Sequence, residues 1–181
     1  MLTALAALII VGPAWADDRF APLGETRTVA IMRHALAPGT GDPPAFRLDD
    51  CTTQRNLSDA GRDQARRVGA AIRAAGTRID AVLSSQWCRC RETAELLGLG
   101  KVGDLPALNS FFEDPSTADR QTRDLRTYLA ALPADKTVLL VTHQVNITAL
   151  TGHGVGSGEV LLLRLAADGS AEVVREIWIE P

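Results

Sequence analysis

Strand-like and helix-like segments alternate along most of this chain. Three apolar segments rich in β-branched residues have the composition of strands buried in a sheet. They span residues 26–32, 79–85 and 136–143. Three further segments have helical character and end at or just before a glycine or a proline. They span residues 58–76, 88–98 and 117–132. The alternation predicts an α/β fold with a mainly parallel central sheet.

The sheet is expected to end in an antiparallel edge. Residues 158–166 and 171–180 have strand character and are joined by the turn Ala-Asp-Gly-Ser, which predicts a hairpin. With helices on both faces of the sheet, the architecture becomes a three-layer sandwich. We expect a loop or tail over residues 17–27. Residues 35–57, rich in glycine and proline, are expected to form a long irregular segment of the kind that often carries function.

The first sixteen residues are almost wholly apolar and carry no charge. They end in Ala14-Trp15-Ala16, the small-x-small pattern of a signal-peptidase site. We therefore expect residues 1–16 to be a signal peptide, with a buried N-terminal helix as the alternative. Residues 17–181 then form a single periplasmic or secreted domain. That part has no apolar stretch long enough to span a membrane, and the net charge of −3 gives no basic surface for nucleic acid.

Export makes the three cysteines informative, because oxidising compartments allow disulfides. Cys88 and Cys90 are too close in sequence to bridge each other comfortably, so Cys51 is expected to pair with one of the two. The Cys-Arg-Cys stretch offers too few ligands for a structural zinc ion. We expect no metal and no cofactor.

Charged and polar groups follow three of the predicted strands. Arg33-His34 ends the first, Ser84-Ser85 ends the second shortly before Arg89 and Arg91, and Thr142-His143-Gln144 ends the segment at residues 136–143. Ligands of open parallel sheets bind outside the carboxyl ends of the strands. Two histidines and several arginines gathered there form an anion site, and arginine matches phosphate oxygens in geometry.

Such a site could transfer a phosphoryl group to nitrogen. A neutral histidine is a nucleophile if its second ring nitrogen is held as a donor, typically to a backbone carbonyl. The positive charge of Arg33 lowers the pKa of His34 and so favours the neutral ring. Taken alone, Arg33-His34 would be read as a strand-end histidine beside a surface arginine; the other two strand ends make it a candidate site.

Four elements of the chain resemble the histidine phosphatase superfamily, which is phosphoglycerate mutase-like. They are "MRHALAPG", with Ala35 where glycine is usual; "NLSDAGRDQA"; "VLSSQWCRCRETAELL", with Gln86 in place of proline; and "VLLVTHQVNITAL". Their order and spacing agree with the family from about residue 28 to residue 165. The resemblance implies the same fold for residues 17–181 and activity on phosphate monoesters.

The resemblance also implies roles for individual residues. His34 would be the nucleophile that becomes phosphohistidine, and Arg33, Arg89, His143 and Gln144 would bind the phosphoryl oxygens. His143 would be charged in the transition state.

The residue that donates a proton to the leaving group has several candidates. The family's glutamate aligns with Ser110, so the acid is Glu113, Asp114 or absent, and we favour Glu113. Arg55 and Asn56 are possible substrate contacts at the rim. Trp87 and Trp178 are expected to be packing residues. The extra methyl group of Ala35 is expected to crowd the approach of backbone to the phosphoryl group.

The sequence thus predicts an exported, metal-independent phosphomonoesterase. Only a short connection follows Ser110, which favours an open pocket and hydrolysis over mutase transfer. The substrate is expected to be a small phosphorylated molecule or an envelope phosphoglycan, the latter from a weaker resemblance to a small exported branch linked to removal of lipopolysaccharide-core phosphate. One alternative is a weak or inactive phosphate-binding module of the same fold. Another is a thiol-based redox protein that uses Cys88 and Cys90.

Overall fold

The computed structural model describes residues 18–181, so the expected signal peptide at residues 1–16 lies outside the described residues. The chain forms one six-stranded sheet with the strand order β3-β2-β4-β1-β5-β6. The strands are β1 (Thr28–Arg33), β2 (Ala81–Ser84), β3 (Val102–Asp104), β4 (Val138–Thr142), β5 (Val160–Leu165) and β6 (Ala171–Ile177). The first four strands are parallel to one another, whereas β5 and β6 run antiparallel at one edge.

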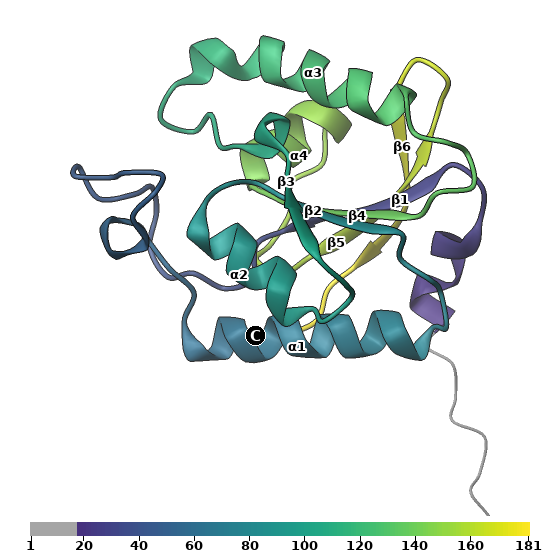
Figure 1. Cartoon of the computed structure of the whole chain (residues 1–181), viewed down its shortest axis with the longest axis horizontal. Helices are drawn as coiled ribbons and strands as arrows, with labels where there is room; N and C mark the ends of the chain where they lie inside the picture. The colour runs from purple at the N-terminus through teal and green to yellow at the C-terminus, as the bar shows by residue number, and fades with distance from the viewer. Residues whose placement is uncertain (1–17) are drawn as a thin grey trace, which may run out of the picture.

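Helices cover both faces of the sheet (Figure 1). They are α1 (Asp59–Ala74), α2 (Cys88–Leu96), α3 (Ala118–Ala130) and α4 (Gln144–Thr151). In Figure 1, α1 and α2 lie below the sheet and α3 and α4 lie above it. The predicted three-layer α/β sandwich with an antiparallel edge is confirmed.

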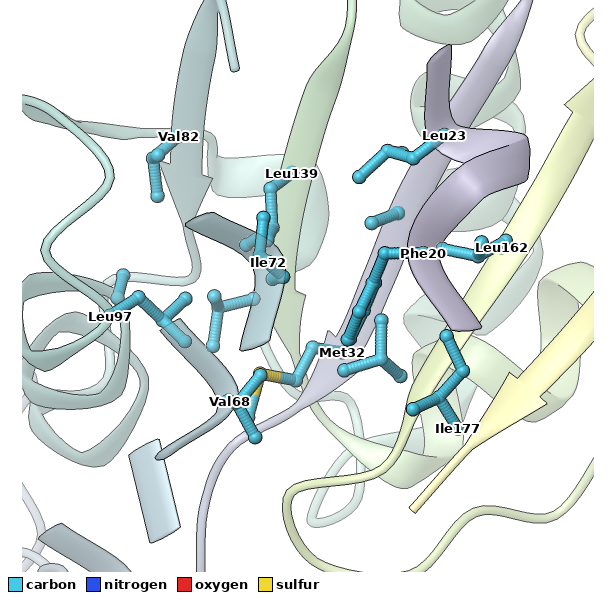
Figure 2. Close-up of a cluster of buried hydrophobic side chains, with 14 of the residues drawn as sticks. Phe20, Leu23, Met32, Val68, Ile72, Val82, Leu97, Leu139, Leu162 and Ile177 are labelled. Carbon is cyan, nitrogen blue, oxygen red and sulfur yellow. The ribbon is translucent and has the colours of Figure 1, made fainter. Parts of the chain in front are cut away.

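Each face of the sheet has its own apolar core. On the α1 and α2 side, Val68, Ile72 and Leu97 pack on Met32 and Leu139 of the central strands (Figure 2). On the other side, residues of α3 and α4 pack on the opposite face of the same strands. Burial of apolar side chains on both faces explains why the central strands read as continuous apolar segments.

The N-terminal segment differs from the sequence expectation. Residues 17–27 were expected to be a loop or tail, but η1, a 3-10 helix at Asp18–Gly24, packs against the sheet. Its side chains Phe20 and Leu23 are fully buried in the core on the α1 side (Figure 2). Two apolar residues three positions apart were the available signal, and Pro22 and Gly24 obscured it.

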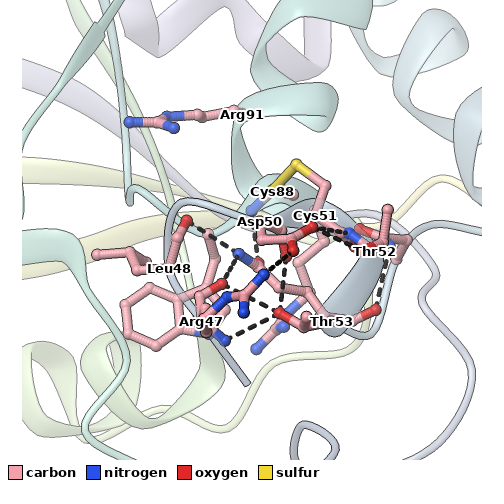
Figure 3. Close-up of a disulfide and its surroundings, with 12 residues drawn as sticks. Arg47, Leu48, Asp50, Cys51, Thr52, Thr53, Cys88 and Arg91 are labelled. Carbon is pink, nitrogen blue, oxygen red and sulfur yellow. Dashed lines mark hydrogen bonds and ion pairs between the residues drawn. A yellow bond between two sulfur atoms is a disulfide. The ribbon is translucent and has the colours of Figure 1, made fainter. Parts of the chain in front are cut away.

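A disulfide joins Cys51 to Cys88, with a Cα–Cα distance of 5.7 Å (Figure 3). The expected pairing of Cys51 with one of the two later cysteines is confirmed. The bond ties η2 (Cys51–Thr53), within the long segment 35–57, to the first residue of α2. That segment is therefore fixed beside Arg89, the next residue of the helix.

The redox alternative does not fit this arrangement. Cys88 is already bonded to Cys51, and Cys90 is a buried free thiol. Burial raises the pKa of Cys90 to about 12, which leaves it a poor nucleophile. Within residues 18–181, no helix has the length and apolar character needed to cross a membrane.

Candidate active site

The carboxyl ends of three neighbouring strands lie at the same level. The register aligns Arg33 of β1 with Thr142 of β4, and the backbone N–H of His34 donates to the carbonyl of Thr142 at 2.9 Å. On the other side of β4, the N–H of Ser85 donates to the carbonyl of Val141 at 2.9 Å. The sheet therefore brings His34, His143 and Ser85 together, as the sequence predicted.

His34 is held as a neutral imidazole. Its side chain is buried, and Nδ1 lies 2.8 Å from the carbonyl oxygen of Ala35, an acceptor, so Nδ1 carries the proton. Nε2 is then unprotonated. Burial lowers the pKa of His34 to about 3, and the positive charges of Arg89 and Arg33 add to this effect.

The backbone after His34 is fixed by two side chains of the motifs. The N–H of Ala35 donates to Thr93 Oγ1 at 3.0 Å, and the N–H of Leu36 donates to Gln64 Oε1 at 3.0 Å. Gly61 is required at the start of α1, because a Cβ there would lie 2.1 Å from the carbonyl oxygen of Leu36. These motif residues hold the backbone around His34 rather than touch a ligand.

The expected crowding by Ala35 is wrong. Its side chain is fully buried in a small apolar cluster with Ala37, Leu57 and Ala65. Ala35 is not among the residues that line the cavity over His34. The methyl group therefore packs toward α1 and leaves the phosphoryl approach unobstructed.

His143 borders the same space as His34. The two rings are T-shaped with centroids 5.6 Å apart. His143 Nε2 lies 2.9 Å from Ser85 Oγ, and Nδ1 lies 3.5 Å from Nη2 of Arg89. Burial lowers the pKa of His143 well below its usual value, with further lowering from His34 and Arg89. His143 is therefore neutral in the free protein, and its expected charge would require the arrival of an anion.

Two arginines face the histidines. Arg89 is buried, and Arg33 is partly buried with Nη1 donating to the carbonyl of Val155 at 3.1 Å. Within the described part of the chain, the Nε atoms of both arginines are buried and have no hydrogen-bond partner. Burial lowers the pKa of Arg33, and the charge of Arg89 lowers it further. An anion between them would satisfy donors and relieve this repulsion.

Asp42, which was not among the expected site residues, neutralises part of this charge. Asp42 Oδ1 accepts from Arg89 Nη1 at 2.8 Å in a buried ion pair, and Oδ2 accepts from Trp87 Nε1 at 3.0 Å. Burial raises the pKa of Asp42, but the hydrogen bond from Arg89 and the backbone N–H of Arg55 outweigh it, so the pKa lies below its usual range. No motif marks Asp42. The only signal in the sequence was its place in the glycine- and proline-rich segment 35–57.

Replacing Asp42 by asparagine is expected to destabilise the free protein by about 3 kcal/mol, because Arg89 keeps a buried, unbalanced charge. Saturating inorganic phosphate should then stabilise Asp42→Asn more than the wild type, since the anion replaces the lost carboxylate. Urea unfolding with and without phosphate measures both effects.

Asp104→Asn is the matched control for that experiment. Asp104 pairs with Arg91 on the same helix as Arg89, but both side chains are partly exposed to solvent. Its loss should cost less than about 1 kcal/mol and should not change the response to phosphate. Equal phosphate stabilisation of Asp42→Asn and the wild type would contradict a charge-balancing role for Asp42.

A cavity of about 910 Å³ opens above the two histidines. It is lined by the predicted residues His34, Arg33, Arg89, His143, Gln144, Glu113, Asp114, Ser110 and Arg55. Arg55 donates to the carbonyls of Gly41 (Nε, 2.8 Å) and Ala37 (Nη1), so it braces the segment 35–57 as well as lining the cavity.

The two candidate acids have different surroundings. Asp114 caps η4 (Pro115–Thr117) by accepting from the N–H of Ser116 at 3.2 Å. Glu113 lies across the mouth from Gly41, where a Cβ would sit 2.9 Å from Glu113 Oε1. The structure thus leaves Glu113 the freer carboxylate.

One sequence expectation does not hold at the rim and one does not hold elsewhere. Asn56 does not line the cavity; its side-chain amide donates to the carbonyls of Cys51 and Gln54 and stabilises that turn. Trp87 packs against the apolar core, as expected, and also lines the cavity. Trp178, also expected to pack, is 53% exposed.

Fold and site together define an α/β protein with an anion pocket of paired histidines and arginines at the carboxyl ends of its central strands. The family model "Histidine phosphatase superfamily (branch 1)" matches residues 29–109. Over this part, the chain matches the histidine phosphatase superfamily. Comparison with curated proteins gave no match.

Solved structures have the same fold. The protein histidine phosphatase SixA complexed with tungstate gives a TM-score of 0.63 at 21% identity, covering 83% of this chain and 96% of that one. YhfR of Bacillus stearothermophilus gives 0.60 at 16% identity, with coverage of 82% and 95%. A mycobacterial glucosyl-3-phosphoglycerate phosphatase gives 0.54 at 19% identity, with coverage of 84% and 97%. At these identities the likeness is one of fold.

Proposed function

We propose that this protein is a phosphomonoesterase that forms a phosphohistidine on His34. The observation that carries the proposal is the state of His34: a buried, neutral ring with Nδ1 fixed on the carbonyl of Ala35 and Nε2 unprotonated, beside two arginines with buried free donors. That combination provides a nucleophile and the positive charge that a transferring phosphoryl group needs.

The reaction then has two displacements at phosphorus. In the first, His34 Nε2 forms the N–P bond while the bond from phosphorus to the leaving oxygen breaks, and Glu113 gives its proton to that oxygen. In the second, Glu113 takes a proton from water, the water oxygen bonds to phosphorus and the N–P bond breaks. Arg33, Arg89 and His143 stabilise the charge on the phosphoryl oxygens in both steps.

Hydrolysis is favoured over the alternative of a phosphate-binding module. That alternative was based on the serine at position 110, where the family has its acid. The cavity contains Glu113 instead, three residues on and without a capping role. The structural neighbours include a protein histidine phosphatase and a glucosyl-3-phosphoglycerate phosphatase, which supports a phosphatase activity for this fold.

The proposed activity is independent of metal ions, because Arg33, Arg89 and His143 supply the charge stabilisation. The experiment that tests the proposal is rapid-quench hydrolysis of a labelled aryl phosphate in EDTA. We expect an initial burst of phenol and a protein-bound phosphate that is stable to base and labile to acid. Phosphate binding without burst or turnover on any phosphomonoester would contradict the proposal and favour the binding module.

We further propose that the protein acts in the cell envelope or outside the cell. Support comes from the disulfide between Cys51 and Cys88, a bond typical of oxidising compartments, and from the Ala14-Trp15-Ala16 pattern. N-terminal sequencing of the protein from a periplasmic or culture fraction should begin at Asp17. Recovery of the uncleaved chain from the cytosol alone would contradict this.

A further inference from the structure

The cavity has a charged floor and apolar walls. Above His34 and His143, the walls consist largely of aromatic, proline and aliphatic side chains. They are Pro43, Pro44, Phe46, Trp87, Phe111, Phe112, Val145 and Ala149. The part of a substrate that carries the phosphate would therefore lie against apolar surface.

The aromatic wall begins at the reaction centre. Trp87 meets the His143 ring in a T-shaped contact with centroids 5.3 Å apart, and its other neighbour is Phe46, stacked at 5.2 Å and 21°. The rings thus extend continuously from a phosphate-contacting histidine along the wall. A planar group bonded to the phosphoryl oxygen would meet ring faces or edges at once.

A further aromatic residue lies at the mouth of the cavity and is exposed to solvent. Phe112 is 49% exposed, one of two large apolar side chains so exposed in the part of the chain that the structure describes. It lies across from Gly41, where a Cβ would be 3.9 Å from Phe112 Cε1. The segments that carry Gly41 and Phe112 therefore face each other over the entrance.

The charges of the walls oppose a second anionic group. Among the described residues that line the cavity, the cations are Arg33, Arg89 and Arg55. The first two belong to the phosphoryl floor, and two nitrogens of Arg55 donate to backbone carbonyls. The carboxylate of Asp114 also lines the cavity, next to the proposed acid Glu113.

We propose that the substrate is a phosphate monoester whose leaving group is an uncharged, largely apolar ring system. This rests on the proposed phosphatase function and names the substrate class of the same site. Esters whose alcohol part carries a carboxylate or a second phosphate are disfavoured, because they would place an anion against the apolar wall and near the carboxylate of Asp114.

Two esters of similar size and reactivity test the charge preference. We expect kcat/KM for 4-carbamoylphenyl phosphate to exceed that for 4-carboxyphenyl phosphate by about tenfold. In Asp114→Asn the ratio should shrink toward one, since a facing negative charge is removed while the side-chain oxygen that caps η4 is kept. A ratio near one, or a preference for the carboxylate, in the wild type would overturn the proposal.

Two variants test the aromatic wall. Phe112→Ala should raise KM for 1-naphthyl phosphate about three- to tenfold and leave KM for glycerol 2-phosphate nearly unchanged. Trp178→Ala is the matched control, because Trp178 is the other large exposed aromatic side chain and does not line this cavity; it should change neither value.

The outcomes separate this inference from the function on which it rests. The substrate class is overturned if Phe112→Ala changes KM equally for 1-naphthyl phosphate and glycerol 2-phosphate. It is also overturned if the wild type prefers glycerol 2-phosphate to the naphthyl ester. Either result leaves the phosphatase function intact. Hydrolysis of no ester by the wild type overturns both.

Discussion

Replacing His34 by alanine is expected to reduce hydrolysis of 1-naphthyl phosphate by a factor of at least about 10³. The reason is that no nitrogen nucleophile would remain to attack phosphorus and displace the leaving oxygen. The arginines of the floor remain in His34→Ala, so inorganic phosphate should still bind. Steady-state kinetics and calorimetric titration with phosphate measure the two effects separately.

His153→Ala is the matched control for that variant. His153 is exposed and pairs with Glu176 on β6, outside the cavity. It should retain wild-type rates. Because His34 is buried, a thermal melt must also show that His34→Ala is folded. Wild-type activity in a folded His34→Ala protein, or an unchanged base-stable phosphoprotein, would show that the nucleophile lies elsewhere.

The lowered pKa of His34 also predicts how the stability of His34→Ala depends on pH. A histidine whose folded pKa of about 3 lies below its unfolded value binds protons better when unfolded. The stability associated with it is present above the unfolded pKa and is lost as the pH falls toward 3. His34→Ala should therefore lose less stability than the wild type between about pH 6.5 and pH 4.

The sheet and the floor of the site could be predicted from the sequence because each depends on local patterns. Continuous apolar segments mark buried parallel strands, and parallel strands end at the same edge. His34, Arg89 and His143 follow three such segments, so their meeting requires only the topology. The partner of Cys51 was limited to two candidates by the same reasoning.

The walls and the charge balance could not be predicted because they depend on how irregular segments fold back. Asp42 lies 47 residues before its partner Arg89, with no periodicity to relate the two. Trp87 precedes a helix, and only the disulfide-anchored segment that brings Phe46 beside it makes it a cavity wall. Asn56, expected at the rim, is used by the turn at Cys51. Loop conformation sets all of these positions, and single-residue chemistry does not encode it.

The second large effect is expected at His143. His143→Ala should lower kcat/KM for 1-naphthyl phosphate by about 10²- to 10³-fold, the usual cost of losing one donor to a developing oxyanion. In the free protein the ring is neutral, because burial and the nearby charges lower its pKa. An incoming phosphate dianion opposes that lowering, so His143 can hold a proton when the phosphoryl group needs one.

Ser85→Ala separates this donor role from simple packing. Ser85 Oγ lies 2.9 Å from His143 Nε2 and touches the ring away from Arg89. Because Ser85 positions the ring, Ser85→Ala should lower kcat/KM about tenfold and shift the acid limb of the pH profile. His143→Ala should abolish the contribution of the imidazole to that limb. If His143→Ala lowers kcat/KM no more than Ser85→Ala does, the ring serves only to pack against Arg89. A loss one or two orders of magnitude larger assigns His143 the contact with the phosphoryl oxygens that its place opposite His34 predicts.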